Sequence, residues 1–135
     1  MTPTDRFSIQ EHEGEYEDRP LQSALFFSGE TLDFTVPGYV IDQQFELPDY
    51  YLLFINWDCP FEEGCEVIVI SKQLELVGSY SFKPFYNSYL LDTVVELSKD
   101  HYQLTFNGPN KFEMFICYPK RSWFKKVVKV KALSD

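Results

Sequence analysis

The chain has few of the residues that enzyme chemistry most often uses. Its 135 residues include two histidines, three cysteines and six scattered glycines. Neither His12 nor His101 has a second His or Cys at the spacing of a metal site. The sequence also lacks the Gly-x-Ser-x-Gly pattern of a nucleophile elbow and any glycine-rich loop that would cradle a phosphate. We therefore expect no metal and no cofactor, and we favour a protein that is not an enzyme.

One enzymatic alternative stays open, because glycosidase-type chemistry needs only two carboxylates at a set distance. The chain has 21 acidic residues, and no pair among them stands out. An enzyme of this type would bring two acids into one cleft and raise the pKa of at least one of them.

Long hydrophobic runs are also absent. The N-terminal segment contains no apolar stretch of the kind found in signal peptides. No part of the chain approaches the roughly 20 apolar residues that a membrane-spanning helix needs. The odd number of cysteines fits reduced thiols better than a set of disulfides. These features predict a soluble, cytoplasmic protein with no membrane association.

Basic residues are scarce in the first half of the chain and concentrated at its end. Residues 1–63 contain 14 acids and 2 bases, residues 64–118 contain 6 acids and 4 bases, and residues 119–135 contain 1 acid and 6 bases. The formal net charge is −9. Nucleic acid is not expected as a partner, because phosphate binding needs clustered Lys and Arg. A basic protein partner fits this balance, and so does a purely solubilising surface.

What the sequence does have is aromatic residues and alternation. It contains 13 Phe, 9 Tyr and 2 Trp, and Phe and Tyr favour strands. Apolar and polar residues alternate in several segments, as half-buried strands do. In residues 39–47, for example, Ile41 and Phe45 are expected to share one face. Turn signals recur between such segments. The pattern predicts one all-β domain over residues 1–135, an antiparallel sandwich or barrel of about 8–10 strands.

Two segments and one ambiguity refine this prediction. Residues 50–57 and 66–70 are apolar at both parities, which is typical of strands in the middle of a sheet with both faces covered. A second sheet, a helix or a second copy of the chain could cover them, so a homodimer stays open. Residues 88–98 fit either a strand or one short helix, with a slight preference for the strand because of the Thr-Val-Val run.

The basic end of the chain predicts an intramolecular contact. Lys129 and Lys131 alternate with apolar residues, as in an edge strand protected by lysines. Glutamates recur with the same period near the N-terminus, at Glu11, Glu13, Glu15 and Glu17. We expect the two segments to lie near each other, because opposite charges facing each other across strands are favourable.

The segment NWDCPFEEGCEV, residues 56–67, is the densest group of reactive residue types. The spacing of Cys59 and Cys65 is wrong for a zinc site, the EF-hand pattern is absent, and a disulfide would need an oxidising compartment. Pro60 and Gly64 favour a turn between two buried strands. We predict that this turn carries acids outward and forms a contact surface. The acids expected to point outward are Asp58, Glu62, Glu63 and Glu66. The candidate partner-binding residues are Trp57, Asp58, Phe61, Glu62 and Glu63.

These observations favour a non-enzymatic module that binds a basic partner protein. In size and charge the chain resembles the small acidic immunity proteins with which bacteria neutralise nuclease toxins. That resemblance implies a bacterial neutralising role, but it rests on no shared motif and assigns no residue a role. The alternative is a β-domain that binds a small molecule or a carbohydrate on exposed aromatic faces.

Overall fold

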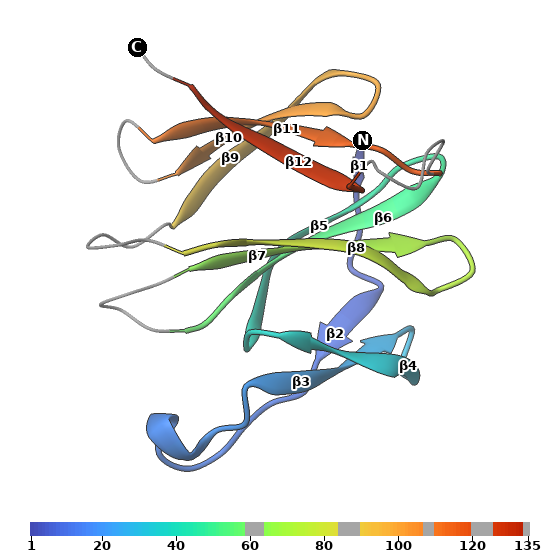
Figure 1. The fold of residues 1–135 in the computed structure, drawn as a ribbon. Coiled ribbons are helices and arrows are strands. Elements are labelled where there is room, and N and C mark those ends of the chain that lie inside the picture. The colour runs from blue at the N-terminus through green and yellow to red at the C-terminus, as the bar shows by residue number, and fades with distance from the viewer. Residues whose placement is uncertain (59–63, 84–89, 107–109, 120–125, 134–135) are drawn as a thin grey trace.

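The computed structural model describes residues 1–58, 64–83, 90–106, 110–119 and 126–133. Within these residues the chain forms twelve β-strands and one short 3-10 helix, η1 (Tyr16–Asp18), and no α-helix. The strands make three antiparallel sheets, none of which closes on itself (Figure 1). The predicted all-β fold is confirmed, and of the two expected architectures the sandwich is present and the closed barrel is not.

The middle layer is a five-stranded sheet in the order β1-β5-β6-β7-β8. Its strands are β1 (Thr2–Pro3), β5 (Val40–Glu46), β6 (Tyr50–Asn56), β7 (Cys65–Ser71) and β8 (Leu76–Phe82). The two doubly apolar segments of the sequence are therefore β6 and β7, and they lie next to each other, paired from Tyr50↔Ser71 to Asn56↔Cys65.

The two outer layers flank this sheet, one on each face (Figure 1). One outer sheet has the order β12-β11-β10-β9 and is made of β9 (Leu91–Ser98), β10 (His101–Phe106), β11 (Lys111–Ile116) and β12 (Val128–Leu133). The other has the order β2-β3-β4 and is made of β2 (Phe7–Ile9), β3 (Gln22–Phe27) and β4 (Glu30–Pro37). The chain thus covers both faces of its own central sheet.

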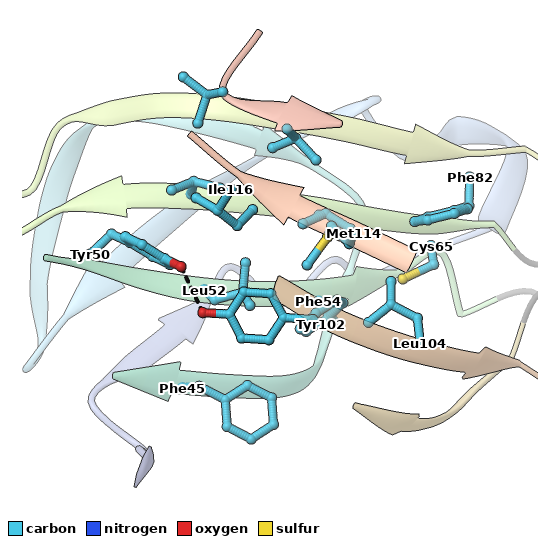
Figure 2. Close-up of a cluster of buried hydrophobic side chains, with 14 of the residues drawn as sticks. Phe45, Tyr50, Leu52, Phe54, Cys65, Phe82, Tyr102, Leu104, Met114 and Ile116 are labelled. Carbon is cyan, nitrogen blue, oxygen red and sulfur yellow. Dashed lines mark hydrogen bonds between the residues drawn. The ribbon is translucent and has the colours of Figure 1, made fainter. Parts of the chain in front are cut away.

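Alternate side chains of β6 enter two separate cores. Leu52 and Phe54 pack toward the four-stranded sheet, where they meet Leu104 and Met114 (Figure 2). Leu53 and Ile55 pack the other way, against residues of the three-stranded sheet. All four β6 side chains have no exposed surface. Because each buried aliphatic side chain contributes roughly 1.5–3 kcal/mol, the double coverage explains why β6 has no polar residue between Tyr50 and Ile55. The expectation of coverage on both faces is confirmed, and sheets of the same chain provide it.

One strand departs from the expected alternation. Ile41 pairs with Ile55 and Gln43 pairs with Phe54, so Asp42 is an extra residue that forms a bulge in β5. The extra residue reverses the alternation of the strand, so residues of the same parity before and after the bulge point to opposite faces of the sheet. Accordingly, Ile41 packs on the core beside the three-stranded sheet, and Phe45 lies in the other core. The prediction that Ile41 and Phe45 share one face is wrong for this reason.

The segment 88–98, which fitted either a strand or a short helix, is a strand where the structure describes it. Residues 91–98 form strand β9, and residues 88–89 lie outside the described residues.

The expected contact between the lysines of β12 and the N-terminal glutamates is wrong. β12 is the end strand of the four-stranded sheet, while residues 11–17 lie beside the three-stranded sheet on the far side of the central layer (Figure 1). Among the described residues, no helix has the length and apolar character needed to cross a bilayer.

Candidate functional site

The predicted contact residues lie at one end of the central sheet. Trp57 and Asp58 follow directly after β6, while Phe61, Glu62 and Glu63 lie outside the described residues. The pairing of Asn56 with Cys65 confirms that this segment connects two neighbouring antiparallel strands. We call the connection, residues 57–64, the tip. The segment between β2 and β3, residues 10–21, is called the arm.

Three aromatic side chains join the arm to the tip. The ring of Tyr39 packs edge-on against Trp57, with centroids 5.2 Å apart, and against Tyr16, with centroids 5.7 Å apart. The Tyr16 hydroxyl donates a hydrogen bond of 2.9 Å to the carbonyl oxygen of Trp57. The Tyr39 hydroxyl donates a hydrogen bond of the same length to the carbonyl oxygen of Pro20. Tyr16, Tyr39 and Trp57, which we call the aromatic cluster, therefore link residues far apart in sequence through both ring contacts and hydrogen bonds.

Trp57 is also held from inside the sheet by Glu66. The indole nitrogen of Trp57 donates to Glu66 Oε1 at 3.1 Å, and the Ser81 hydroxyl donates to Glu66 Oε2. Glu66 is only 3% exposed. The expectation that the turn carries Glu66 outward is therefore wrong. As the second residue of β7, next to β8, Glu66 is buried and uses both carboxylate oxygens as acceptors, as a buried charge requires.

Asp58 keeps its predicted exposed position. Its backbone has a positive φ of 53°, and its amide donates to the Asn56 side chain at 2.9 Å, so Asn56 closes a local turn. The Asp58 carboxylate lies 3.7 Å from the Arg19 guanidinium. That guanidinium also lies over the rings of Tyr16 and Tyr39, at 5.4 and 5.6 Å from their centroids. Arg19 thus adds a third connection between the arm and the tip.

A histidine and a serine anchor the beginning of the arm. His12 Nε2 lies 2.8 Å from Ser23 Oγ, and Ser23 donates to the Gly38 carbonyl oxygen at 2.7 Å. Since the serine proton is committed to Gly38, the histidine nitrogen is the donor in the His12–Ser23 contact. Ser23 is completely buried, so a substrate cannot reach its oxygen. An imidazole next to a hydroxyl resembles a catalytic pair, but here the arrangement fixes the arm to β3.

The outer side of the arm is acidic. Glu11, Glu13, Glu15, Glu17 and Asp18 are all exposed. None of these five acids forms a salt bridge with the residues that the structure describes. Arg19 is the one base in the arm, and it is engaged by Asp58 and the aromatic rings. The aromatic cluster is therefore bordered by unneutralised negative charge.

A second candidate site is a hollow of about 590 Å³ at the opposite end of β6. Its lining includes Tyr50, Tyr102, Asp49, Glu96 and Asp100. The two tyrosine hydroxyl oxygens are 2.6 Å apart (Figure 2). Tyr50 also donates to Asp100 at 2.8 Å. Because Tyr50 donates to Asp100, Tyr102 is the donor in the pair. Burial is the largest cause of the raised pKa of both tyrosines, which reaches about 12 for Tyr102. Both phenols are therefore neutral at ordinary pH.

Asp42 is a further carboxyl group to consider for an acid–base enzyme, which would need a pair of such groups in one cleft. Burial raises the pKa of this carboxyl. Asp42 lines a shallow hollow on β5, and no second acid lines that hollow. In the described part of the chain there is also no group of three or more His, Cys, Asp or Glu side chains that could hold a metal ion.

The sequence found part of the aromatic cluster and missed the rest. It singled out Trp57 and the neighbouring Asp58, and it missed the other two members of the cluster, Tyr16 and Tyr39. It also missed Arg19 and placed Glu66 on the outside. A single acid inside an otherwise apolar strand was the available signal for Glu66. Comparison of the chain with protein-family models, with curated proteins and with solved structures gives no match.

Proposed function

We propose that this protein is a non-enzymatic binding module that engages a basic partner protein through the arm and the tip. The observation that carries the proposal is the position of the five unpaired acids of the arm around the aromatic cluster. Aromatic residues are enriched among the side chains that dominate interface energies, and acids speed the encounter with a basic surface. Tyr16 is 42% exposed and Trp57 is half-buried beside these acids, whereas Tyr39 is buried and supports both rings.

Rigidity supports this surface as a binding site. The Tyr16–Trp57 hydrogen bond, the His12–Ser23 contact and the Trp57–Glu66 hydrogen bond all hold it in the unbound chain. A surface that is already ordered loses less conformational entropy on binding than a mobile one. The proposed role is that of an immunity-like neutraliser acting in the bacterial cytoplasm, where a toxic basic protein would be its target.

The test compares capture of partners by three immobilised proteins from an extract of the source cells. One is the wild type, and the second carries Glu11→Gln, Glu13→Gln, Glu15→Gln and Glu17→Gln. The third is a control that removes four exposed acids elsewhere, with Glu30→Gln, Asp33→Asn, Glu75→Gln and Asp92→Asn. We expect a basic protein to bind the wild type and the control, to be lost by the arm variant, and to elute with salt. Equal retention by the two variants would refute the proposal.

A small-molecule binder is the second candidate, and the hollow at Tyr50 and Tyr102 favours it. About 590 Å³ is within the size range of ligand pockets. The three carboxylates that line it, Asp49, Glu96 and Asp100, would prefer a hydroxylated or cationic ligand. A thermal-shift screen with monosaccharides and small amines tests this candidate. A stabilising compound should lose its effect in Glu96→Gln, and a screen without any stabilising compound would remove the candidate.

A further inference from the structure

A basic groove lies along β12, on the face of the molecule opposite the arm. It is a hollow of about 370 Å³ lined by Lys126, Lys129, Lys131, Tyr80 and Phe115, together with alternate valines of β12. Tyr80 is 37% exposed and Phe115 is 39% exposed, so two aromatic rings reach solvent beside the lysines. Tyr80 comes from β8 of the central sheet, and the other residues belong to β11 and β12 or immediately precede β12. We call this feature the lysine groove.

The positive charge of the lysine groove is not neutralised by the chain. Lys126, Lys129 and Lys131 are exposed, and none of them forms a salt bridge with a described residue. Glu113 is the cross-strand neighbour of Lys131, but its carboxylate lies 3.7 Å from His101. The acids of the arm are on the far side of the central sheet (Figure 1). A protein with a net charge of −9 therefore keeps three lysines together that form no salt bridge with a described residue.

The backbone next to these lysines is open to pairing. β12 is the end strand of its sheet and pairs with β11 on one side, from Lys111↔Leu133 to Ile116↔Val128. No described strand pairs with its other side. An exposed strand edge presents unpaired N–H and C=O groups that a further extended segment can use. Lys129 and Lys131 are two residues apart on one face, so acids at alternate positions of an added strand would meet them.

We propose that the free edge of β12 binds an extended acidic segment of another protein, which adds to the four-stranded sheet as a fifth strand. Main-chain hydrogen bonds would hold the segment, and its acids would face Lys129 and Lys131. Apolar side chains at the alternate positions would lie on the other face of the added strand, toward Tyr80 of β8, since Phe115 pairs with Lys129 and shares the lysine face. This site is separate from the arm and the tip. It would select an acidic partner, whereas the arm and the tip would select a basic one.

The groove fits a peptide better than a nucleic acid. Single-stranded nucleic acids bind by stacking bases on open aromatic faces. One face of Phe115 is already covered, because His101 stacks on it at 4.3 Å with the rings only 11° apart. The acidic remainder of the protein would also repel a phosphate backbone. A free strand edge beside alternating lysines is a feature that a peptide backbone can match.

The experiment measures binding of fluorescein-labelled peptides that have Glu at alternate positions and Val, Leu or Phe between them. Binding is followed by fluorescence anisotropy at low and at physiological salt. The wild type should bind at low salt. The Lys129→Glu/Lys131→Glu variant should bind about tenfold more weakly, since two favourable contacts become repulsive. The Lys129→Arg/Lys131→Arg variant should retain binding. Lys99→Glu, which reverses one charge at the turn after β9, is the matched control for Lys129→Glu alone.

A second measurement follows the backbone of β12 directly. Amide hydrogen exchange should slow within Val128–Leu133 when the peptide binds, and exchange in β9 at the other edge should not change. Circular dichroism and urea unfolding check that the variants are folded, and Lys129→Gln/Lys131→Gln replaces the reversed pair if that variant is not.

Four results would overturn the proposal. They are no peptide binding at low salt, equal weakening by Lys99→Glu and Lys129→Glu, tighter binding of single-stranded RNA than of any peptide, and self-association that Lys129→Glu abolishes. The last two would assign the groove to a nucleic acid or to a second copy of the chain. None of these results bears on the arm, so the proposed function is tested separately.

Discussion

Tyr16 in the arm donates a hydrogen bond of 2.9 Å to the carbonyl oxygen of Trp57, 41 residues further along the chain. The bond joins the 3-10 turn of the arm to the end of β6, and it places both residues beside Tyr39. No residue of η1 is buried. This hydroxyl therefore contributes to the order of the acidic surface, together with the His12–Ser23 contact and the Arg19–Asp58 ion pair.

Tyr16→Phe should loosen the arm while leaving the domain folded. The substitution keeps the ring and removes the donor, so the free energy of unfolding should fall by about 1 kcal/mol or less. The larger effect should be local, with faster amide hydrogen exchange in residues 10–21. Tyr80→Phe is the matched control, because it removes another exposed phenol at a site far from the arm. Unchanged exchange in the arm of Tyr16→Phe would show that the other contacts of the arm hold it without the Tyr16 hydroxyl.

Glu66→Leu should destabilise the domain more than Glu66→Gln. Leucine removes the acceptor of the half-buried Trp57 indole nitrogen and of the exposed Ser81 hydroxyl, and we expect a loss of about 1 kcal/mol. Glutamine can still accept from Trp57 and can donate to the serine oxygen, so its loss should be smaller. Urea unfolding measures both values, and Glu75→Leu is a control at an exposed acid. Equal stability of the two Glu66 variants would mean that these hydrogen bonds contribute nothing to the fold.

The stability of the domain should fall at alkaline pH through Tyr50 and Tyr102. Burial raises the pKa of both, to about 12 for Tyr102, whereas an unfolded tyrosine titrates near 10. Above pH 10 the unfolded chain therefore loses protons that the folded chain keeps. The stabilisation from each group is complete below pH 10 and is lost as the pH rises toward the folded-state pKa. The loss approaches 1.4 kcal/mol per pH unit for each group.

Urea unfolding of the wild type and of Tyr102→Phe between pH 8 and about pH 11.5 measures this effect. The variant keeps the hydrogen bond from Tyr50 to Asp100 and lacks one of the two groups. Its free energy of unfolding should therefore fall less steeply with pH than that of the wild type. Parallel curves would show that Tyr102 titrates normally in the folded chain.

The layered fold could be predicted from the sequence because burial leaves a direct pattern there. Apolar residues at both parities in 50–57 and 66–70 predicted strands with two covered faces, and β6 and β7 have them. The bulge at Asp42 could not be predicted in this way. A bulge depends on how β5 pairs with β6, and the alternation of β5 alone continues through it.

The aromatic cluster was only partly predictable for a related reason. Trp57 and Asp58 are next to a turn signal, and local sequence is enough to mark them. Tyr16 and Tyr39 meet Trp57 only because the three-stranded sheet packs on the central sheet. Glu66 was expected outside because turns usually expose acids, but its position in β7 next to β8 buries it between Trp57 and Ser81. Contacts that depend on packing between sheets leave no periodic signal in the sequence.

Gly78→Ala should destabilise the domain, because Gly78 of β8 packs closely against Val127, the residue just before β12. A Cβ at Gly78 would lie 2.5 Å from Cγ1 and 2.7 Å from Cβ of Val127, which is itself 6% exposed. The neighbouring chain must move to make room, and we expect a loss of about 1–3 kcal/mol.

In the background of Val127→Ala the same substitution should have a smaller effect, because the shorter side chain leaves space. The double-mutant cycle should give a coupling of at least about 0.5 kcal/mol. Urea unfolding measures the four proteins, with Ser79→Ala as the control on β8. Additive effects at Gly78 and Val127 would contradict the close approach of the two sheets at this edge.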